Sequence, residues 1–120
     1  MTSVALSRPW SAVPDEVRRR YASFLLSHPP STVVTGGVVW PYVAFGEGER
    51  TVLFLHGMSG AADIWFQQLE DLASEHRVVA VTYPDVERLE ALLEGVEAVL
   101  DTVGARRVTV VGSSVGGYLA

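Results

Sequence analysis

The sequence has 120 residues, a formal net charge of −5, 48% hydrophobic residues and no cysteine. The high hydrophobic fraction, with only 19% charged residues, excludes a disordered chain. The absence of cysteine excludes a disulfide framework and a zinc–thiolate site. The acidic balance argues against nucleic acid as a partner, because the longest basic cluster is only Arg18-Arg19-Arg20.

The N-terminus carries no recognisable targeting signal. The first ten residues lack the basic segment followed by an apolar segment that a secretory signal needs. No apolar run reaches the roughly 18 residues of a membrane-spanning helix. We therefore expect a cytoplasmic protein with no membrane partner.

The first predicted elements are a helix and a hairpin. The helix begins near Pro14, which two acidic residues follow, and it ends at Pro29-Pro30. Two strands are predicted next, over residues 31–35 and 38–45. The Gly36-Gly37 pair between them is typical of a two-residue hairpin turn.

The pattern changes after residue 50, where short apolar runs alternate with amphipathic helices. Strands are predicted over residues 51–55, 78–81 and 108–111, and helices over 63–75 and 85–102. Within the longer helix, Gly95 is a mild defect. The alternation predicts an α/β fold with a mostly parallel sheet and flanking helices, to which the N-terminal hairpin adds an antiparallel edge.

The sharpest chemical signal is Gly112-Ser113-Ser114-Val115-Gly116, which matches G-x-S-x-G between a predicted strand and a helix. A nucleophile at such a turn has a strained backbone, and the flanking glycines avoid clashes with neighbouring elements. Ser114 is therefore the candidate nucleophile. The Val115 N–H, at the helix N-terminus, is placed to donate to an oxyanion. The alternative is an ordinary glycine-rich strand-to-helix turn.

A second motif, His56-Gly57-Met58-Ser59-Gly60, follows the first predicted parallel strand. This loop is expected to supply the other oxyanion donor, the Met58 N–H. We expect His56 to hold the loop through hydrogen bonds and reject it as the base for Ser114. The other two histidines are interpreted as a helix-end residue, His28, and a surface residue before a strand, His76.

These two motifs, in this order, resemble the α/β-hydrolase superfamily. Residues 53–57 look like its third strand and oxyanion loop, and residues 110–117 look like its fifth strand and nucleophile elbow. The resemblance covers roughly residues 32–120. It implies the N-terminal portion of an α/β-hydrolase fold, with an N-terminal extension and helix over 1–30 and an incomplete hydrolase domain over 31–120.

The family resemblance also implies a catalytic triad in the order Ser, Asp or Glu, then His. Carried over to this sequence, Ser114 is the nucleophile. The Met58 and Val115 amides form the oxyanion hole, and His56 and Gly57 support the loop. The family's acid and histidine follow later strands, so neither is expected within a chain that ends at Ala120.

We therefore expect this sequence to be the N-terminal half of a longer protein, truncated after the nucleophile elbow, with negligible esterase turnover on its own. Asp85 and Asp101 are alternatives for the acid only by stretching the pattern, since both fall at the ends of the predicted 85–102 helix. Residues 108–111 would form an open apolar edge that favours self-association.

One loop departs from the common family pattern. Tyr83-Pro84-Asp85-Val86 stands where many members have Asp-Leu-x-Gly-x-Gly-x-Ser. This loop, residues 59–63 and the Gly-Gly-Tyr-Leu-Ala ending are similar to the maspardin branch, which is regarded mainly as protein-binding. Retention of His56-Gly57 favours a hydrolase.

Two functions follow from the sequence. The first is a serine hydrolase that cleaves a small-molecule ester, thioester or amide through an acyl-Ser114 intermediate. The second is a non-catalytic, maspardin-like scaffold that binds a protein partner. A nucleotide-binding domain is disfavoured, because no G-x-G-x-x-G follows a strand and the chain has no lysine for a Walker A loop. No cofactor or metal is implied.

Overall fold

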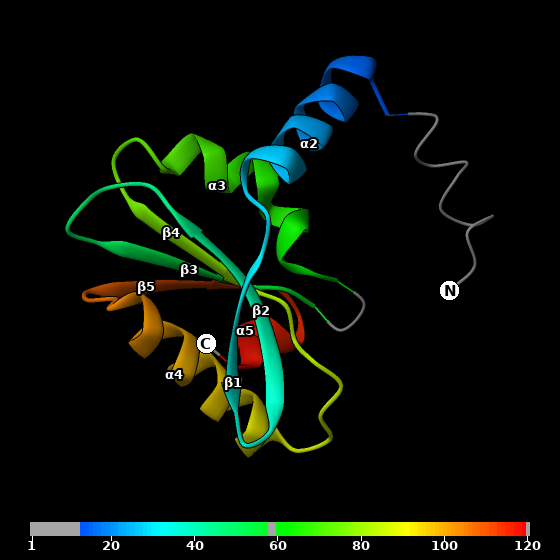
Figure 1. The fold of residues 1–120 in the computed structure, drawn as a ribbon. Helices are drawn as coiled ribbons and strands as arrows, with labels where there is room; N and C mark the ends of the chain where they lie inside the picture. The colour runs from blue at the N-terminus through cyan, green and yellow to red at the C-terminus, as the bar shows by residue number, and fades with distance from the viewer. Residues whose placement is uncertain (1–12, 58–59, 120) are drawn as a thin grey trace.

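The computed structural model describes residues 13–57 and 60–119, without the side chains of residues 115 and 118, and shows one five-stranded sheet with helices on both faces (Figure 1). The strands are β1 (Ser31–Thr35), β2 (Val38–Phe45), β3 (Thr51–Leu55), β4 (Arg77–Val81) and β5 (Val108–Gly112). The helices are α2 (Asp15–Ser27), the 3₁₀ turn η1 (Ala62–Trp65), α3 (Phe66–Leu72), α4 (Leu89–Val103) and α5 (Val115–Leu119).

The strand order is β1-β2-β4-β3-β5. β1 and β2 pair as the predicted antiparallel hairpin, and Gly36 and Gly37 both have the positive φ that its two-residue turn requires. β2 pairs antiparallel with β4, whereas β3 pairs in parallel with both β4 and β5. The sheet is thus mixed, and the predicted α/β class with an antiparallel edge is confirmed.

Two apolar clusters fill the two sides of the sheet. The cluster beneath α2, η1 and α3 contains Phe24, Val43, Val52, Phe54, Ala62, Leu69, Val78 and Ala80. The cluster beneath α4 contains Trp40, Tyr42, Leu53, Leu55, Val79, Val81, Val96 and Val99. Alternate side chains of β3 and β4 enter opposite clusters, which explains why both strands are continuous apolar runs in the sequence.

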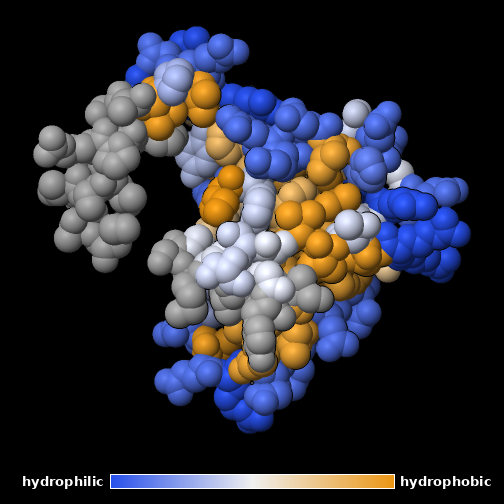
Figure 2. All heavy atoms as spheres, turned by 180° about the vertical axis from the view of Figure 1, so that it is seen from behind, coloured by the Kyte–Doolittle hydropathy of each residue, from blue (hydrophilic) through white to orange (hydrophobic). Residues whose placement is uncertain are grey.

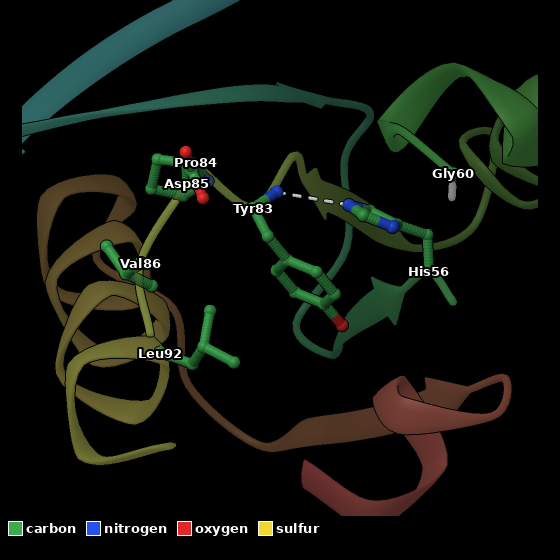
Figure 3. A pocket seen from close by; sticks show the side chains of 7 residues that line it. All are labelled: His56, Gly60, Tyr83, Pro84, Asp85, Val86 and Leu92. Atoms are coloured by element: carbon green, nitrogen blue, oxygen red, sulfur yellow. Dashed lines mark hydrogen bonds between the residues drawn. The ribbon is translucent and has the colours of Figure 1, made fainter. Parts of the chain in front are cut away.

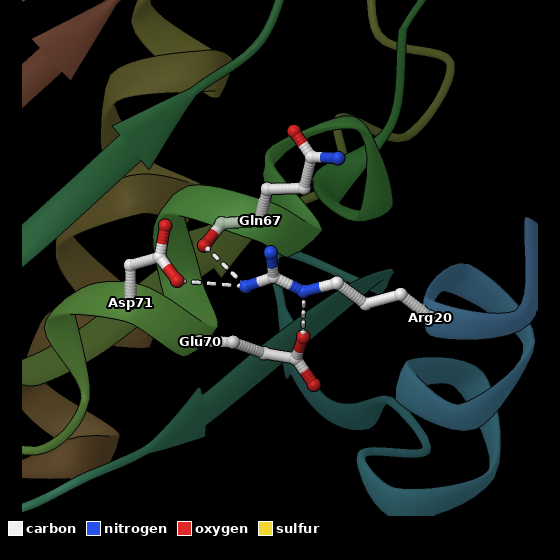
Figure 4. A network of polar contacts seen from close by, with 4 residues as sticks. All are labelled: Arg20, Gln67, Glu70 and Asp71. Carbon is white, nitrogen blue, oxygen red and sulfur yellow. Dashed lines mark hydrogen bonds and ion pairs between the residues drawn. The ribbon is translucent and has the colours of Figure 1, made fainter. Parts of the chain in front are cut away.

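The contacts of helix α2 with this domain include a buried aromatic side chain and a polar network with α3. Phe24 is 1% exposed within the first cluster. Arg20 donates to the Glu70 carboxylate at 2.9 Å, to the Asp71 carboxylate at 2.7 Å and to the Gln67 carbonyl at 3.3 Å, all on α3 (Figure 4). The N-terminal helix therefore covers part of the sheet, although the proposed division at residue 30 stays a prediction.

Two predicted helix boundaries were wrong. The helix predicted from residue 85 begins at Leu89, because the chain first makes a tight turn in which the Val86 N–H bonds back to the Pro84 carbonyl at 2.9 Å. The helix predicted over 63–75 is divided into η1 and α3. It ends at Leu72, where the chain turns towards β4 and the Ala73 carbonyl accepts the Glu47 N–H at 3.2 Å.

β5 lies at one end of the described sheet. Val110 and Val111 of this strand are each 37% exposed. Viewed from behind, the molecule has an apolar area with hydrophilic side chains around it (Figure 2). None of the helices described by the structure is long and apolar enough to span a bilayer.

Candidate active site

The two sequence motifs meet at one edge of the sheet. Leu55 of β3 is paired with Val81 of β4 on one side and with Gly112 of β5 on the other. The loops that leave these parallel strands therefore start next to one another at the carboxyl ends, where α/β folds bind ligands. Figure 3 shows this region, with the loop after β4 facing His56.

Ser114 lies in the sharp turn between β5 and α5. Its φ is +57°, and among the described residues only Arg107 is another non-glycine residue with positive φ. The left-handed conformation is costly for a residue with a side chain, and such strain clusters at functional sites. Ser114 is an exposed residue.

The two flanking glycines make this turn possible. A Cβ added at Gly112 would lie 2.3 Å from the Gly116 carbonyl oxygen, in α5. A Cβ added at Gly116 would lie 2.2 Å from the Leu55 carbonyl oxygen, in β3. Both contacts are with backbone, so neither neighbour can move aside cheaply. The glycines thus allow the helix and the neighbouring strand to approach closely, as the motif predicts.

Gly57 brings the second motif to the serine. A Cβ added at Gly57 would lie 3.5 Å from the Ser114 Cβ, which places the loop after β3 in contact with the turn after β5. The Ser113 N–H also donates to the Leu55 carbonyl at 3.1 Å. Of the predicted oxyanion donors, Met58 lies outside the described residues and Val115 is the first residue of α5. Their role stays a prediction.

His56 is 1% exposed, and both of its ring nitrogens have partners. The Tyr83 N–H donates to Nε2 at 3.0 Å, so Nε2 is unprotonated. Nδ1 then carries the proton and donates to the Gly57 carbonyl at 2.5 Å. Burial lowers the pKa of His56 below its ordinary value of 6.5, against the opposing effects of the Gly57 hydrogen bond and the Asp63 charge. These bonds join the loop after β3 to the loop after β4 through His56, whose loop-supporting role stays a prediction.

The other candidate bases and acids lie elsewhere. His28 ends α2 and stacks on Phe45 with a centroid distance of 3.7 Å. His76 is half-buried before β4, with a buried Nδ1 that lacks a hydrogen-bond partner, so it is less exposed than predicted. Asp101 is exposed in the last turn of α4. Within the described part of the chain, no histidine or carboxylate is hydrogen-bonded to Ser114.

Asp85 does not begin a helix, contrary to the prediction; it is exposed in the loop between β4 and α4. There it borders a cavity of about 300 Å³ (Figure 3). The cavity is lined by His56, Gly60, Tyr83, Pro84, Asp85, Val86 and Leu92. Its walls are mostly apolar, and Asp85 is the one carboxylate among them.

Tyr83 is the site residue that sequence reasoning missed. Its ring lies on His56 with a centroid distance of 3.9 Å, and its hydroxyl is buried without a hydrogen-bond partner. Burial raises its pKa to about 12. A second bond between the same two loops joins the Ala62 N–H to the Thr82 hydroxyl at 2.9 Å. The only available signal was that the Tyr83-Pro84 pair departs from the common pattern.

Residues 52–120 match the family model described as the alpha/beta hydrolase family. The chain belongs to the α/β-hydrolase family. This assignment fits both the strand order and the position of the two motifs. No three His, Cys, Asp or Glu side chains of this α/β-hydrolase come together as a metal site within the part that the structure describes.

Several curated proteins are similar to this α/β-hydrolase. The dihydrolipoyllysine-residue acetyltransferase component of the acetoin cleaving system of Cupriavidus necator is 34% identical over 93 residues, which cover 70% of this chain and 25% of that protein. Epoxide hydrolase 4 of Mus musculus is 30% identical over 96 residues, covering 70% and 27%. Maspardin of Rattus norvegicus is 36% identical over 81 residues, covering 63% and 31%.

Solved structures agree on the fold. An epoxide hydrolase of Vigna radiata has a TM-score of 0.66 at 28% identity, covering 79% of this chain and 34% of that one. An N-acyl homoserine lactone degrading enzyme has a TM-score of 0.68 at 28% identity, covering 74% and 38%. The α/β-hydrolase described here thus spans 25–38% of the length of these relatives.

Proposed function

We propose that this protein is a serine hydrolase that cleaves a small-molecule ester, thioester or amide through an acyl-Ser114 intermediate. One observation carries the proposal. Ser114 has a left-handed backbone in an exposed turn that Gly112 and Gly116 hold against β3. Membership of the α/β-hydrolase family supports a hydrolase in general, and the serine mechanism rests on this turn.

In the proposed reaction, the Ser114 Oγ attacks the substrate carbonyl carbon and the hydroxyl proton passes to a base. The Val115 and Met58 N–H groups stabilise the resulting oxyanion. Collapse of the intermediate expels the alcohol, thiol or amine, which takes up the proton. Water then attacks the acyl-Ser114 ester and releases the acid, restoring the hydroxyl.

The base is proposed to come from outside these 120 residues. All three histidines of the sequence are described by the structure, and none is hydrogen-bonded to Ser114. We therefore expect the 120 residues alone to hydrolyse a p-nitrophenyl ester negligibly. Fast hydrolysis that depends on Ser114 would contradict this expectation. Sequence that continues the reading frame gives a direct check, because an acid followed by a histidine after later strands would complete the set.

A fluorophosphonate probe tests the nucleophile on the complete protein. We expect labelling in the unchanged protein and none in Ser114→Ala. Ser113→Ala is the matched control, because it removes the neighbouring hydroxyl and leaves the proposed nucleophile in place. Labelling that persists in Ser114→Ala and disappears in Ser113→Ala would contradict the proposal, because it would identify Ser113 as the nucleophile.

A non-catalytic scaffold is the second candidate. Similarity to maspardins of three vertebrates favours it, at 34–36% identity over 58–63% of this chain. This candidate predicts a complete protein that is folded by circular dichroism and is not labelled by the fluorophosphonate. Labelling at Ser114 would argue against it.

A further inference from the structure

The two loops at the site are held together by one histidine–tyrosine pair. His56 follows β3 and Tyr83 follows β4, 27 positions later. Both the backbone and the ring of Tyr83 contact the histidine. The Tyr83 N–H donates to Nε2 at 3.0 Å, and the centroids of the two rings are 3.9 Å apart. Gly60 closes the other side, because a Cβ there would lie 3.1 Å from the His56 Cβ. The imidazole therefore has little room to rotate.

Resting on the function proposed above, we propose that Tyr83 is a positioning residue for the Ser114 site. The Tyr83 backbone N–H holds His56 as the neutral Nδ1–H tautomer, and the Tyr83 ring covers the imidazole. His56 in turn holds the carbonyl of Gly57, the residue that packs against Ser114. Each link corresponds to a contact in the structure. Nε2 must accept from Tyr83, so Nδ1 must donate to Gly57, and Gly57 is the residue packed against the serine.

Protonation of His56 should break the hydrogen bond between the two loops. An imidazolium has two N–H donors, so its Nε2–H would face the Tyr83 N–H and that hydrogen bond would be lost. The charged groups around the ring come from two segments. Asp63 of η1 favours the protonated form, and Asp85 borders the cavity on the β4 side, whereas the Tyr83 ring helps to exclude water. The loops should therefore separate in acid.

The first test is the nitrogen-15 NMR signal of the His56 ring, measured on the 120-residue chain. We expect a neutral Nδ1–H tautomer near neutral pH and a midpoint below 6.5. Tyr83→Ala uncovers the ring and is expected to raise that midpoint by about half a pH unit or more. Tyr83→Phe keeps the ring and is expected to leave the midpoint unchanged. An Nε2–H tautomer, or equal midpoints in all three proteins, would overturn the proposal.

The second test links the pair to the serine on the complete protein. The rate of fluorophosphonate labelling should fall in acid in two steps, one from protonation of the base that activates Ser114 and one at the His56 midpoint measured by NMR. Only the second step should disappear in His56→Gln. Glutamine presents an oxygen near the Nε2 position to accept the Tyr83 N–H and does not titrate. An unchanged acid fall in His56→Gln would overturn the positioning role even if Tyr83→Ala fails to fold.

The two proposals fail differently. Normal labelling with the wrong tautomer would refute only the inference about Tyr83. Absent labelling at every pH, with the expected tautomer, would refute the serine hydrolase and with it any catalytic purpose of the pair.

Discussion

The backbone of Gly95 in α4 lies directly against the Trp40 indole of β2. A Cβ at position 95 would lie 1.8 Å from Cε2 and 1.9 Å from Cζ2 of that ring. Trp40 is only 1% exposed, so the indole is enclosed by the second core cluster. The glycine that looks like a helix defect in the sequence therefore allows α4 to pack closely on the sheet.

Gly95→Ala should destabilise the protein by about 1–3 kcal/mol, because the inserted methyl group overpacks a closed core. The loss should outweigh the ~1 kcal/mol that alanine gains over glycine in a helix. Urea denaturation measures the difference. In a Trp40→Leu background, which makes room, the same change should be neutral or stabilising. An equal loss in both backgrounds would contradict the steric explanation.

Gly116 and Gly117 are neighbours in α5 with opposite expected effects. A Cβ at Gly116 would lie 2.2 Å from a backbone oxygen of β3, whereas the nearest atom to a Cβ at Gly117 is 3.6 Å away. Gly116→Ala should cost about 1–3 kcal/mol and move the serine turn away from β3. Gly117→Ala is the matched control and should be neutral or slightly stabilising. Equal stability of the two variants in urea would contradict the claim that Gly116 is needed for close packing against β3.

The sequence predicted the strands well because their apolar runs are continuous, and β3 keeps its predicted bounds of 51–55. The family resemblance also placed Ser114 and Gly57 in one site, and the pairing of β3 with β5 brings the two residues together. The sequence did not predict the late start of α4, where a tight turn over residues 84–86 overrides an amphipathic pattern. The His56–Tyr83 contact joins residues that are distant in the chain, and no local spacing encodes it.

Stability should depend on the protonation of His56. Its pKa is lowered in the folded state, mainly by burial, whereas the unfolded chain takes up the proton near 6.5. The neutral histidine's contribution is therefore complete above pH 6.5, declines as the pH falls towards the folded-state pKa, and changes no further below it. Urea unfolding at about pH 7.5 and about pH 5 should show a larger loss in the unchanged protein than in His56→Gln. Equal losses would contradict the assignment, since both proteins keep His28 and His76.

Two tyrosine-to-phenylalanine changes should have opposite signs. The Tyr83 hydroxyl is buried without a partner, so Tyr83→Phe removes an unsatisfied group and should stabilise by about 1 kcal/mol. The Tyr21 hydroxyl donates to the Asp63 carboxylate at 2.5 Å, so Tyr21→Phe should destabilise by about 1 kcal/mol. Urea denaturation at neutral pH compares them. A loss of stability in Tyr83→Phe would mean that its hydroxyl has a partner after all.

The carboxylate of Asp85 should select against negatively charged substrates if the cavity receives part of the ester. Asp85 is the one charged residue among those that line it. A carboxylate on the substrate about 7 Å away would be disfavoured by roughly 1 kcal/mol, or about 5-fold, at an effective dielectric constant of about 40. Asp85→Asn should therefore raise kcat/KM for an anionic ester relative to its neutral isostere by about that factor.

Asp101→Asn is the matched control for Asp85→Asn. It removes the same charge about 18 Å along α4 from the helix start, where salt screens its effect on the cavity. The ratio of the two kcat/KM values should then stay unchanged, and added salt should reduce the Asp85 effect. A similar gain in both variants would show that the net charge of the protein, and not the position of Asp85 at the cavity, disfavours the anionic ester.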